Sequence, residues 1–282
     1  MEFLQGYYLS KTKIYTLFLE KRIKKNNADC KREDALVLGD VVSIIEEESI
    51  DFICENKKLG ILYEDDYLLI VNKPAGMLVH PDSKDKTGSL CNVVAGYYRN
   101  KGYDLSVKYA HRLDMETTGI LIFCKDMLTM AYMNHCISTH EVKRYYRLFV
   151  GGRLKNSSGT IDLPIGEDRH HGSRRRVSKT GQPAVTHYRG LREFKEYSYV
   201  EARLETGRTH QIRVHFSHIN HPLLGDELYH GDSKNIKRVA LHSYKAEFIH
   251  PVTGKLVSIV RDLPYDMRAL LGGEYDYREA CK

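Results

Sequence analysis

The chain has 282 residues, of which 28% are charged, and a formal net charge of +6. This length allows one large domain or a large domain with a small one, and the positive charge is compatible with an anionic partner without requiring one. No apolar stretch is long enough to span a bilayer, and the N-terminus lacks the apolar run of a signal peptide. We therefore expect a soluble, cytoplasmic protein with no membrane contact.

The distribution of cysteine and histidine argues against a bound metal. None of the six cysteines forms a C-x-x-C pair, and the sequence contains no H-E-x-x-H. The neighbours His170 and His171 would point apart on a strand or a helix. The sequence also lacks phosphate-binding and redox motifs, so it predicts neither a metal site nor a cofactor.

The N-terminal segment is rich in basic residues. Ile14, Leu17 and Phe18 have helical spacing, and Ser10 before them is a natural N-cap. The basic residues that punctuate this segment are Lys11, Lys13, Lys21, Arg22, Lys24 and Lys25.

A boundary is expected after this segment. Residues 36–42 (LVLGDVV) are typical of a turn between strands. The acidic run at 46–48 and the polar stretch at 55–58 then separate the segment from the rest of the chain. We expect a small α/β module in residues 1–50 and a large domain in residues 55–282.

The large domain alternates strand and helix signals without the regular rhythm of β-α-β units. Apolar runs at 67–71, 119–124 and 145–150 predict strands, and 197–204 alternates as a half-buried strand does. A helix is predicted at 127–137. This pattern indicates an α+β fold with a mixed, largely antiparallel sheet.

The segment 208–219 fits two structures. Its apolar residues alternate as in a strand, but Ile212 and Phe216 also lie on one helical face. Thr209 before them is a natural N-cap, which favours the helix. Arg208 then lies just outside its N-terminus.

Two strings contain the candidate chemistry. The string YAHRLDMETTG (109–119) runs into a predicted strand and leaves Asp114 in a polar turn at its start. Functional carboxylates often occupy such positions, although an Asx-type turn with Thr117 has the same spacing. In ETGRTHQIRVH (205–215), Arg208 follows a glycine and can meet a carboxylate through two N–H donors. An ordinary surface arginine is the alternative.

Together these strings resemble the signatures H-R-L-D-x-x-T-[ST]-G and G-R-T-H-Q-I-R-V-H of the RluA-type pseudouridine synthases. Further segments are similar to that family in the same order along the chain: VNKPAG at 71–76, KRYYRLFVG at 143–151, GQPAVT at 181–186, HPLLGD at 221–226 and ALHSY at 240–244. The N-terminal segment resembles the ribosomal-protein-type RNA-binding module that precedes the catalytic domain in many relatives.

The resemblance implies an enzyme that isomerises specific uridines in a structured RNA to pseudouridine without a cofactor. Asp114 would be the catalytic carboxylate, Arg208 would pair with it, and Tyr145 would stack on the uracil. The residues implied to bind the substrate are His111, Arg112, Thr118 and Leu241. Those expected to contact RNA phosphates are Arg174, Arg175, Arg176 and Lys179.

Two other classes of protein remain as alternatives. A nucleoside glycosidase usually needs a second carboxylate to activate water, and Glu116 is the near candidate for that role. A non-catalytic RNA-binding protein would more readily have lost Asp114, Tyr145 or Arg208. Ribosomal RNA is favoured over transfer RNA by its frequency within the family, and we expect a monomer.

Overall fold

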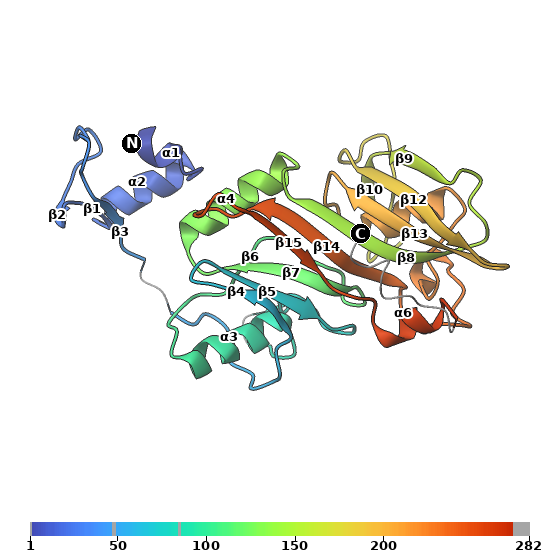
Figure 1. Cartoon of the computed structure of the whole chain (residues 1–282). Coiled ribbons are helices and arrows are strands. Elements are labelled where there is room, and N and C mark those ends of the chain that lie inside the picture. Colours follow the sequence, from blue (N-terminus) through green and yellow to red (C-terminus); the bar gives the residue numbers. More distant parts are fainter. Residues whose placement is uncertain (1, 47–48, 84–85, 273–282) are drawn as a thin grey trace.

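The computed structural model describes residues 2–46, 49–83 and 86–272. Most of its strands join one large sheet (Figure 1). The strands of this sheet are β4 (Ile61–Glu64), β5 (Leu68–Lys73), β6 (Lys108–Tyr109), β7 (Thr118–Cys124), β8 (Lys143–Gly151), β9 (Ser158–Asp162), β12 (Val185–Glu193), β13 (Tyr197–Leu204), β14 (Leu241–Ile249) and β15 (Leu256–Val260).

The ten-stranded sheet is mixed and mostly antiparallel. Its main order is β4-β5-β7-β14-β8-β13-β12-β9, with β15 beside β14 and β6 beside β7. Strands β7 and β14 run parallel, whereas β5 with β7 and β8 with β13 run antiparallel. The predicted α+β fold with a mixed, largely antiparallel sheet is confirmed.

Helices and short strands complete the large domain. They are α3 (Leu90–Lys101), α4 (Met127–Ser138), α5 (Gln211–His218), α6 (Tyr265–Ala269), the 3-10 turn η1 (Glu227–Tyr229), and the hairpin of β10 (Ile165–Glu167) and β11 (Arg175–Val177). In the described part of the chain, no helix combines the length and the apolar character needed to cross a membrane.

Helices cover both faces of the sheet. Successive side chains of a strand point to opposite faces, so neighbouring residues of β5 enter different cores. Leu69 packs in one cluster with residues of α3 and α5. On the opposite face, Ile70 packs with Met133 of α4, and Phe149 of β8 packs with Met267 of α6. Figure 1 accordingly shows α3 and α4 on opposite sides of the sheet.

The N-terminal segment forms a small sheet of its own. It contains α1 (Glu2–Gln5), α2 (Lys11–Leu19), β1 (Ile23–Lys25), β2 (Ala28–Asp29) and β3 (Val42–Ile44), with the strands in the order β2-β1-β3. The side chain of Ser10 accepts the backbone N–H of Lys13 at 3.1 Å. The predicted helix and its N-cap are therefore confirmed.

This N-terminal unit packs against α4 of the large domain. Ile14 and Leu17 share a hydrophobic cluster with Met127 and Ala131 of α4. The carboxylate of Glu46 accepts the backbone N–H of Met127 at 3.0 Å, at the first turn of that helix. The expected boundary at 46–48 includes residues 47 and 48, which lie outside the described residues, and the division into two domains stays a prediction.

Gly119 allows β14 to pack closely against the first residues of β7, the strand that follows Asp114. Its φ is 109°, which residues with side chains rarely adopt. A Cβ at this position would lie 2.1 Å from the carbonyl oxygen of Ser243 in β14. The parallel pairing of β7 with β14 therefore requires glycine here.

The substitution Gly119→Ala should lower the free energy of unfolding by about 3 kcal/mol or more, because backbone strain adds to the overlap with β14. The matched control is Gly102, the C-cap of α3, which has a φ of 73° and no described atom within 4 Å of the added Cβ. Gly102→Ala should cost about 1–2 kcal/mol. Chemical denaturation measures both, and equal losses would contradict the close-approach argument.

Candidate active site

Asp114 occupies the turn that leads into β7. The backbone N–H of Thr117 donates to the backbone carbonyl of Asp114 at 3.0 Å and closes this turn. The side-chain carboxylate of Asp114 is 25% exposed. The turn is thus closed by the main chain, and the carboxylate is left for other partners.

The side chains of Lys73 and Arg238 donate hydrogen bonds to backbone carbonyls of this turn. The Nζ of Lys73, at the end of β5, donates to the carbonyl of Met115 at 2.8 Å, and Nη1 of Arg238 donates to the carbonyl of Glu116 at 3.2 Å. Burial lowers the pKa of Lys73 to about 8, while the charges of Glu116 and Asp114 oppose that change. The lysine of the N-K-P segment therefore fixes the position of the turn.

The carboxylate of Asp114 pairs with Arg213. Nη1 of Arg213 donates to Oδ2 of Asp114 at 3.2 Å. The Nε and Nη2 of the same guanidinium bind both carboxylate oxygens of buried Asp226, at 2.7 and 2.8 Å. Burial disfavours the charge, but the bonds to Asp226 and the charge of Asp114 together raise the pKa of Arg213 above its usual value. Asp226 thus orients the arginine that faces Asp114.

The expected pair between Arg208 and Asp114 is wrong. The segment forms the predicted helix, α5, but its N-cap is His210, with a φ of 58°, and not Thr209. Arg208 remains on the preceding loop, where its Nε donates to the carbonyl of Pro183 at 2.9 Å. Sequence reasoning missed the second arginine of the same motif, which the first turns of the helix direct toward Asp114.

His210 stands beside the same carboxylate. Its Nε2 lies 4.0 Å from Oδ2 of Asp114, and its Nδ1 lies 3.0 Å from the hydroxyl of Tyr229. That hydroxyl accepts the backbone N–H of Arg175 in β11 at 2.8 Å. Burial lowers the pKa of His210, against the effect of Asp114, so the ring is neutral near pH 7. These contacts connect the β10–β11 hairpin to the site.

The tyrosine of β8 that the charge of Asp114 influences is Tyr146. Tyr146 is 4% exposed, and burial raises its pKa; the charge of Arg144 lowers this pKa and that of Asp114 raises it. Tyr145 points to the opposite face of β8, where its ring lies 6.4 Å from that of Tyr244. The structure therefore does not bring Tyr145 to the group around Asp114, because neighbouring residues of a strand point to opposite faces.

Three of the predicted substrate-binding residues differ in their burial. His111 is buried, and burial lowers its pKa to about 3, so its ring is neutral. Arg112 is exposed, two positions before Asp114. Leu241 is buried in the same hydrophobic cluster as Tyr146.

The fourth predicted substrate-binding residue, Thr118, forms a hydrogen bond between two strands of the sheet. Its hydroxyl lies 2.8 Å from Nδ1 of His242, whose Nε2 lies 2.9 Å from the carbonyl of Arg261. Because a carbonyl only accepts, Nε2 carries the proton, and Thr118 donates to Nδ1. Burial lowers the pKa of His242 to about 4 and keeps this neutral form. The hydroxyl therefore joins β7 to β14, and the expectation that Thr118 binds substrate stays a prediction.

The basic hairpin of β10 and β11 abuts the site. The guanidinium of Arg174 lies 5.4 Å from the ring centroid of Tyr229, and Arg175 pairs with Glu167 at 2.9 Å. Arg176 and Lys179 are exposed. The predicted basic stretch thus contacts Tyr229, which in turn contacts His210.

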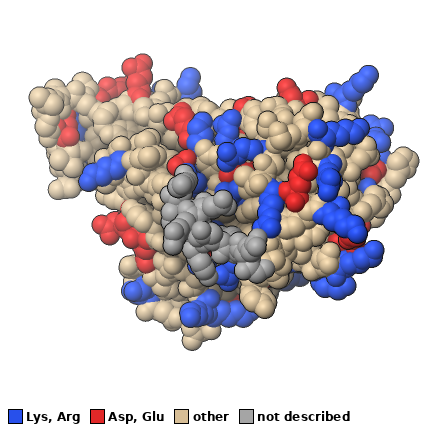
Figure 2. Space-filling view, turned by 45° about the vertical axis from the view of Figure 1, so that its right-hand side comes forward, with Lys and Arg blue, Asp and Glu red and all other residues tan. Residues whose placement is uncertain are grey.

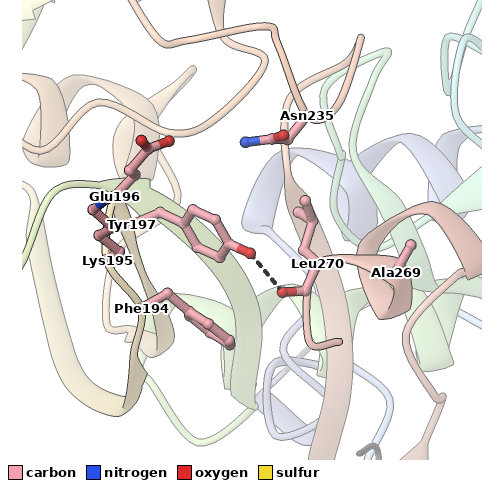
Figure 3. A pocket seen from close by; sticks show the side chains of 7 residues that line it. All are labelled: Phe194, Lys195, Glu196, Tyr197, Asn235, Ala269 and Leu270. Atoms are coloured by element: carbon pink, nitrogen blue, oxygen red, sulfur yellow. Dashed lines mark hydrogen bonds between the residues drawn. The ribbon is translucent and has the colours of Figure 1, made fainter. Parts of the chain in front are cut away.

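A separate hollow of about 480 Å³ lies near α6 (Figure 3). The hydroxyl of Tyr197 donates to the carbonyl of Leu270 across it at 2.8 Å. The hollow shares no residue with the group around Asp114. Its lining residues are Phe194, Lys195, Glu196, Tyr197, Asn235, Ala269 and Leu270.

The fold is that of solved pseudouridine synthases. Human RNA pseudouridylate synthase domain containing 4 matches with a TM-score of 0.61 and 25% identity, over 75% of this chain and 91% of that chain. Human RNA pseudouridylate synthase domain containing 1 has the same TM-score of 0.61 at 22% identity, over 78% of this chain and 87% of that one. The second likeness supports the fold alone.

The sequence comparisons define the class. The sequence profile described as RNA pseudouridylate synthase matches residues 67–218, a range that includes Asp114, Tyr146 and Arg213. The uncharacterized RNA pseudouridine synthase YhcT of Bacillus subtilis is 40% identical over 93% of this chain and 88% of its own length. Ribosomal large subunit pseudouridine synthase D of Neisseria meningitidis is 34% identical, over 93% and 74%.

The chain therefore belongs to the RNA pseudouridylate synthase family, and it is an isomerase that converts uridine in RNA to pseudouridine. Of the three classes weighed from the sequence, these matches favour the isomerase over the glycosidase and the non-catalytic RNA-binding protein.

We expect Arg213→Lys to lower turnover by about a hundredfold or more, because a lysine offers the charge without the fork that holds both Asp226 and Asp114. Arg208→Lys should stay within about tenfold of the parent, since Arg208 bonds a loop carbonyl. Tritium release from RNA labelled at C5 of uridine measures both, with thermal midpoints to exclude unfolding. The reverse order of the two losses would restore Arg208 as the partner of Asp114.

Tyr146→Phe should slow product formation strongly and leave RNA binding intact, because the ring remains while the hydroxyl is lost beside Asp114. The control is Tyr145→Phe, which changes the adjacent residue on the opposite face of β8 and should keep the parent rate within about twofold. Single-turnover assays at saturating RNA separate the chemical step from binding. Equal rates for Tyr146→Phe and the parent would remove the hydroxyl from the chemistry.

Proposed function

We propose that Asp114 is the catalytic carboxylate of this synthase and that Arg213 and Tyr146 act beside it. The supporting observation is a partly exposed carboxylate bonded at 3.2 Å to an arginine that Asp226 anchors. Pseudouridine formation breaks the bond between C1′ and N1, turns the uracil and rejoins it through C5. One carboxylate serves either route, by attack on C1′ or by removal of the C2′ proton.

The target uridine must leave the base stack to reach Asp114. Extruding a nucleotide from a stacked RNA costs a few kcal/mol. We propose that Arg112, exposed two residues before Asp114, fills the vacated space. Its planar cation can stack on the neighbouring bases.

The proposed RNA surface includes the β10–β11 hairpin. Its contact with Tyr229 puts the hairpin beside the candidate site, and cations that contact phosphates supply much of the affinity for RNA. Lys and Arg side chains gather on the right-hand part of the face in Figure 2. The hairpin residues proposed to contact phosphates are Arg174, Arg175, Arg176 and Lys179.

The proposed substrate is ribosomal RNA of the large subunit, with transfer RNA as the second candidate. The relatives from Neisseria meningitidis, Buchnera aphidicola and Haemophilus influenzae that are 33–34% identical are ribosomal large subunit pseudouridine synthases D. We further propose that the enzyme acts as a monomer in the cytoplasm.

We also propose that the N-terminal unit adds RNA affinity. Lys11 and Lys13 are exposed on α2, while Ile14 and Leu17 of the same helix pack toward α4. The helix thus has a buried apolar side and an exposed basic one, so it can contact RNA while docked.

Asp114→Asn should abolish isomerisation, with a loss of several orders of magnitude, because it keeps the shape but removes the nucleophile or base. In a strain that lacks the gene, mapping of pseudouridine across all RNA should reveal a missing site in large-subunit ribosomal RNA. The parent chain should restore that site, and Asp114→Asn should not.

The control for this experiment is Asp104→Asn, at an exposed aspartate, which should restore the site fully. Restoration by Asp114→Asn would refute the catalytic role. A missing site confined to transfer RNA would refute the ribosomal substrate and leave the catalytic role standing.

Replacement of both Lys11 and Lys13 by Gln should weaken RNA binding and leave turnover at saturating RNA unchanged. Each lost phosphate contact should reduce the slope of log affinity against log salt by about 0.7–0.9. These substitutions spare the packing of α2 on α4, so the thermal midpoint should match that of the parent. An unchanged salt slope would mean that the N-terminal unit only covers α4.

A further inference from the structure

Arg144 is a buried guanidinium without a counter-charge. It is the second residue of β8 and is 5% exposed. Its Nε is buried and has no hydrogen-bond partner, and no ion pair joins Arg144 to a carboxylate in the part of the chain that the structure describes. Burying a charge without a partner is costly, and native proteins rarely do so without a reason. A guanidinium in this setting is suited to binding an anion.

This guanidinium lies at the candidate active site. Arg144 and Tyr146 are two residues apart in one strand and so point to the same face. After burial itself, the charge of Arg144 is the main influence that lowers the pKa of His111, and it also acts on Tyr146, as does the charge of Asp114. Arg144 and Asp114 thus influence the same tyrosine, and the histidine beside Arg144 is neutral.

The exposed residue Gly207 lies next to this guanidinium. Gly207 is exposed on the loop between β13 and α5. A Cβ there would lie 3.3 Å from Nη1 and 3.5 Å from Nη2 of Arg144. Its φ is outside the left-handed region, so the backbone does not require glycine here. A side chain at this position would contact the guanidinium closely, and Arg208 adds positive charge to the same loop.

We propose that Arg144 and the Gly207 loop bind a backbone phosphate of the RNA next to the extruded uridine. A guanidinium binds two phosphate oxygens with parallel N–H donors. The phosphates of a nucleotide lie close to its own ribose, so a site beside Tyr146 is near enough to receive one. The proposal rests on the family's action on RNA and assigns the phosphate subsite of the same site.

The test compares two small probes, uridine and uridine 3′,5′-bisphosphate, by isothermal titration calorimetry on the full chain. The parent should bind the bisphosphate more tightly than uridine. Arg144→Met should weaken the bisphosphate by about tenfold or more and change uridine by less than about twofold, because it removes charge-assisted bonds to phosphate. The thermal midpoint should not fall, since an apolar side chain replaces an unpaired buried charge.

Two further variants provide a charge control and a second test of the same site. Arg147→Met removes one positive charge from the same strand on the opposite face, where Arg147 pairs with Glu201 at 3.2 Å, and should leave both affinities unchanged. Gly207→Ala keeps the guanidinium but places a methyl group 3.3 Å from its Nη1, so it should weaken the bisphosphate selectively even if Arg144→Met folds poorly. Neither probe depends on turnover, so these results stand apart from the assignment of Asp114.

Three outcomes would overturn the proposal. The first is a parent that binds both probes equally. The second is an equal loss of affinity for uridine and for the bisphosphate in Arg144→Met, which would mean that the guanidinium contacts the nucleoside and not a phosphate. The third is a bisphosphate affinity that neither Arg144→Met nor Gly207→Ala changes.

Discussion

The guanidinium of Arg213, shared between Asp226 and Asp114, is the contact on which the site depends. Asp226 is 1% exposed and takes two bonds from Arg213, so the arginine has one orientation left and presents Nη1 to Asp114. A buried carboxylate with a buried guanidinium is costly to desolvate, and here each of the three guanidinium nitrogens has an acceptor. The third nitrogen, Nη1, therefore points to the carboxylate of Asp114, which is partly exposed to solvent.

The sheet supplies the other half of this geometry. Asp114 precedes β7, and β7 pairs in parallel with β14 at Thr118 and Gly119. Glycine permits the close approach, the Thr118 hydroxyl bonds to His242 across the pair, and Lys73 fixes the turn from the end of β5. A loop residue held from several rigid elements has little freedom, which is the condition for placing one carboxylate against one sugar.

The two regions proposed to bind RNA differ in their distance from Asp114. The β10–β11 hairpin reaches the site through Tyr229 and His210. The N-terminal unit packs on α4, which follows the far end of the seven-residue strand β7. At 3.3 Å per residue, β7 alone separates that unit from Asp114 by about 20 Å. Contacts made by the N-terminal unit would therefore select the RNA at a distance, while the hairpin would act next to the reacting uridine.

The sequence by itself determined the family, the fold class and the position of Asp114. These follow from the order of several short motifs and from the period of apolar residues, both of which are local properties of the chain. The same reasoning predicted several individual helices and strands. The elements α2, α4, α5, β7 and β13 lie where the pattern of apolar residues indicated.

Only the tertiary structure decided which side chain of each motif enters the site. Tyr145 and Tyr146 are adjacent in a strand and point to opposite faces, so a shift of one position exchanges them. Arg208 and Arg213 belong to one motif, but the rotation of α5 depends on His210 adopting a left-handed backbone at its start, which no residue spacing predicts. The partner that orients Arg213 is Asp226, from a different segment, and such a contact exists only once the chain has folded.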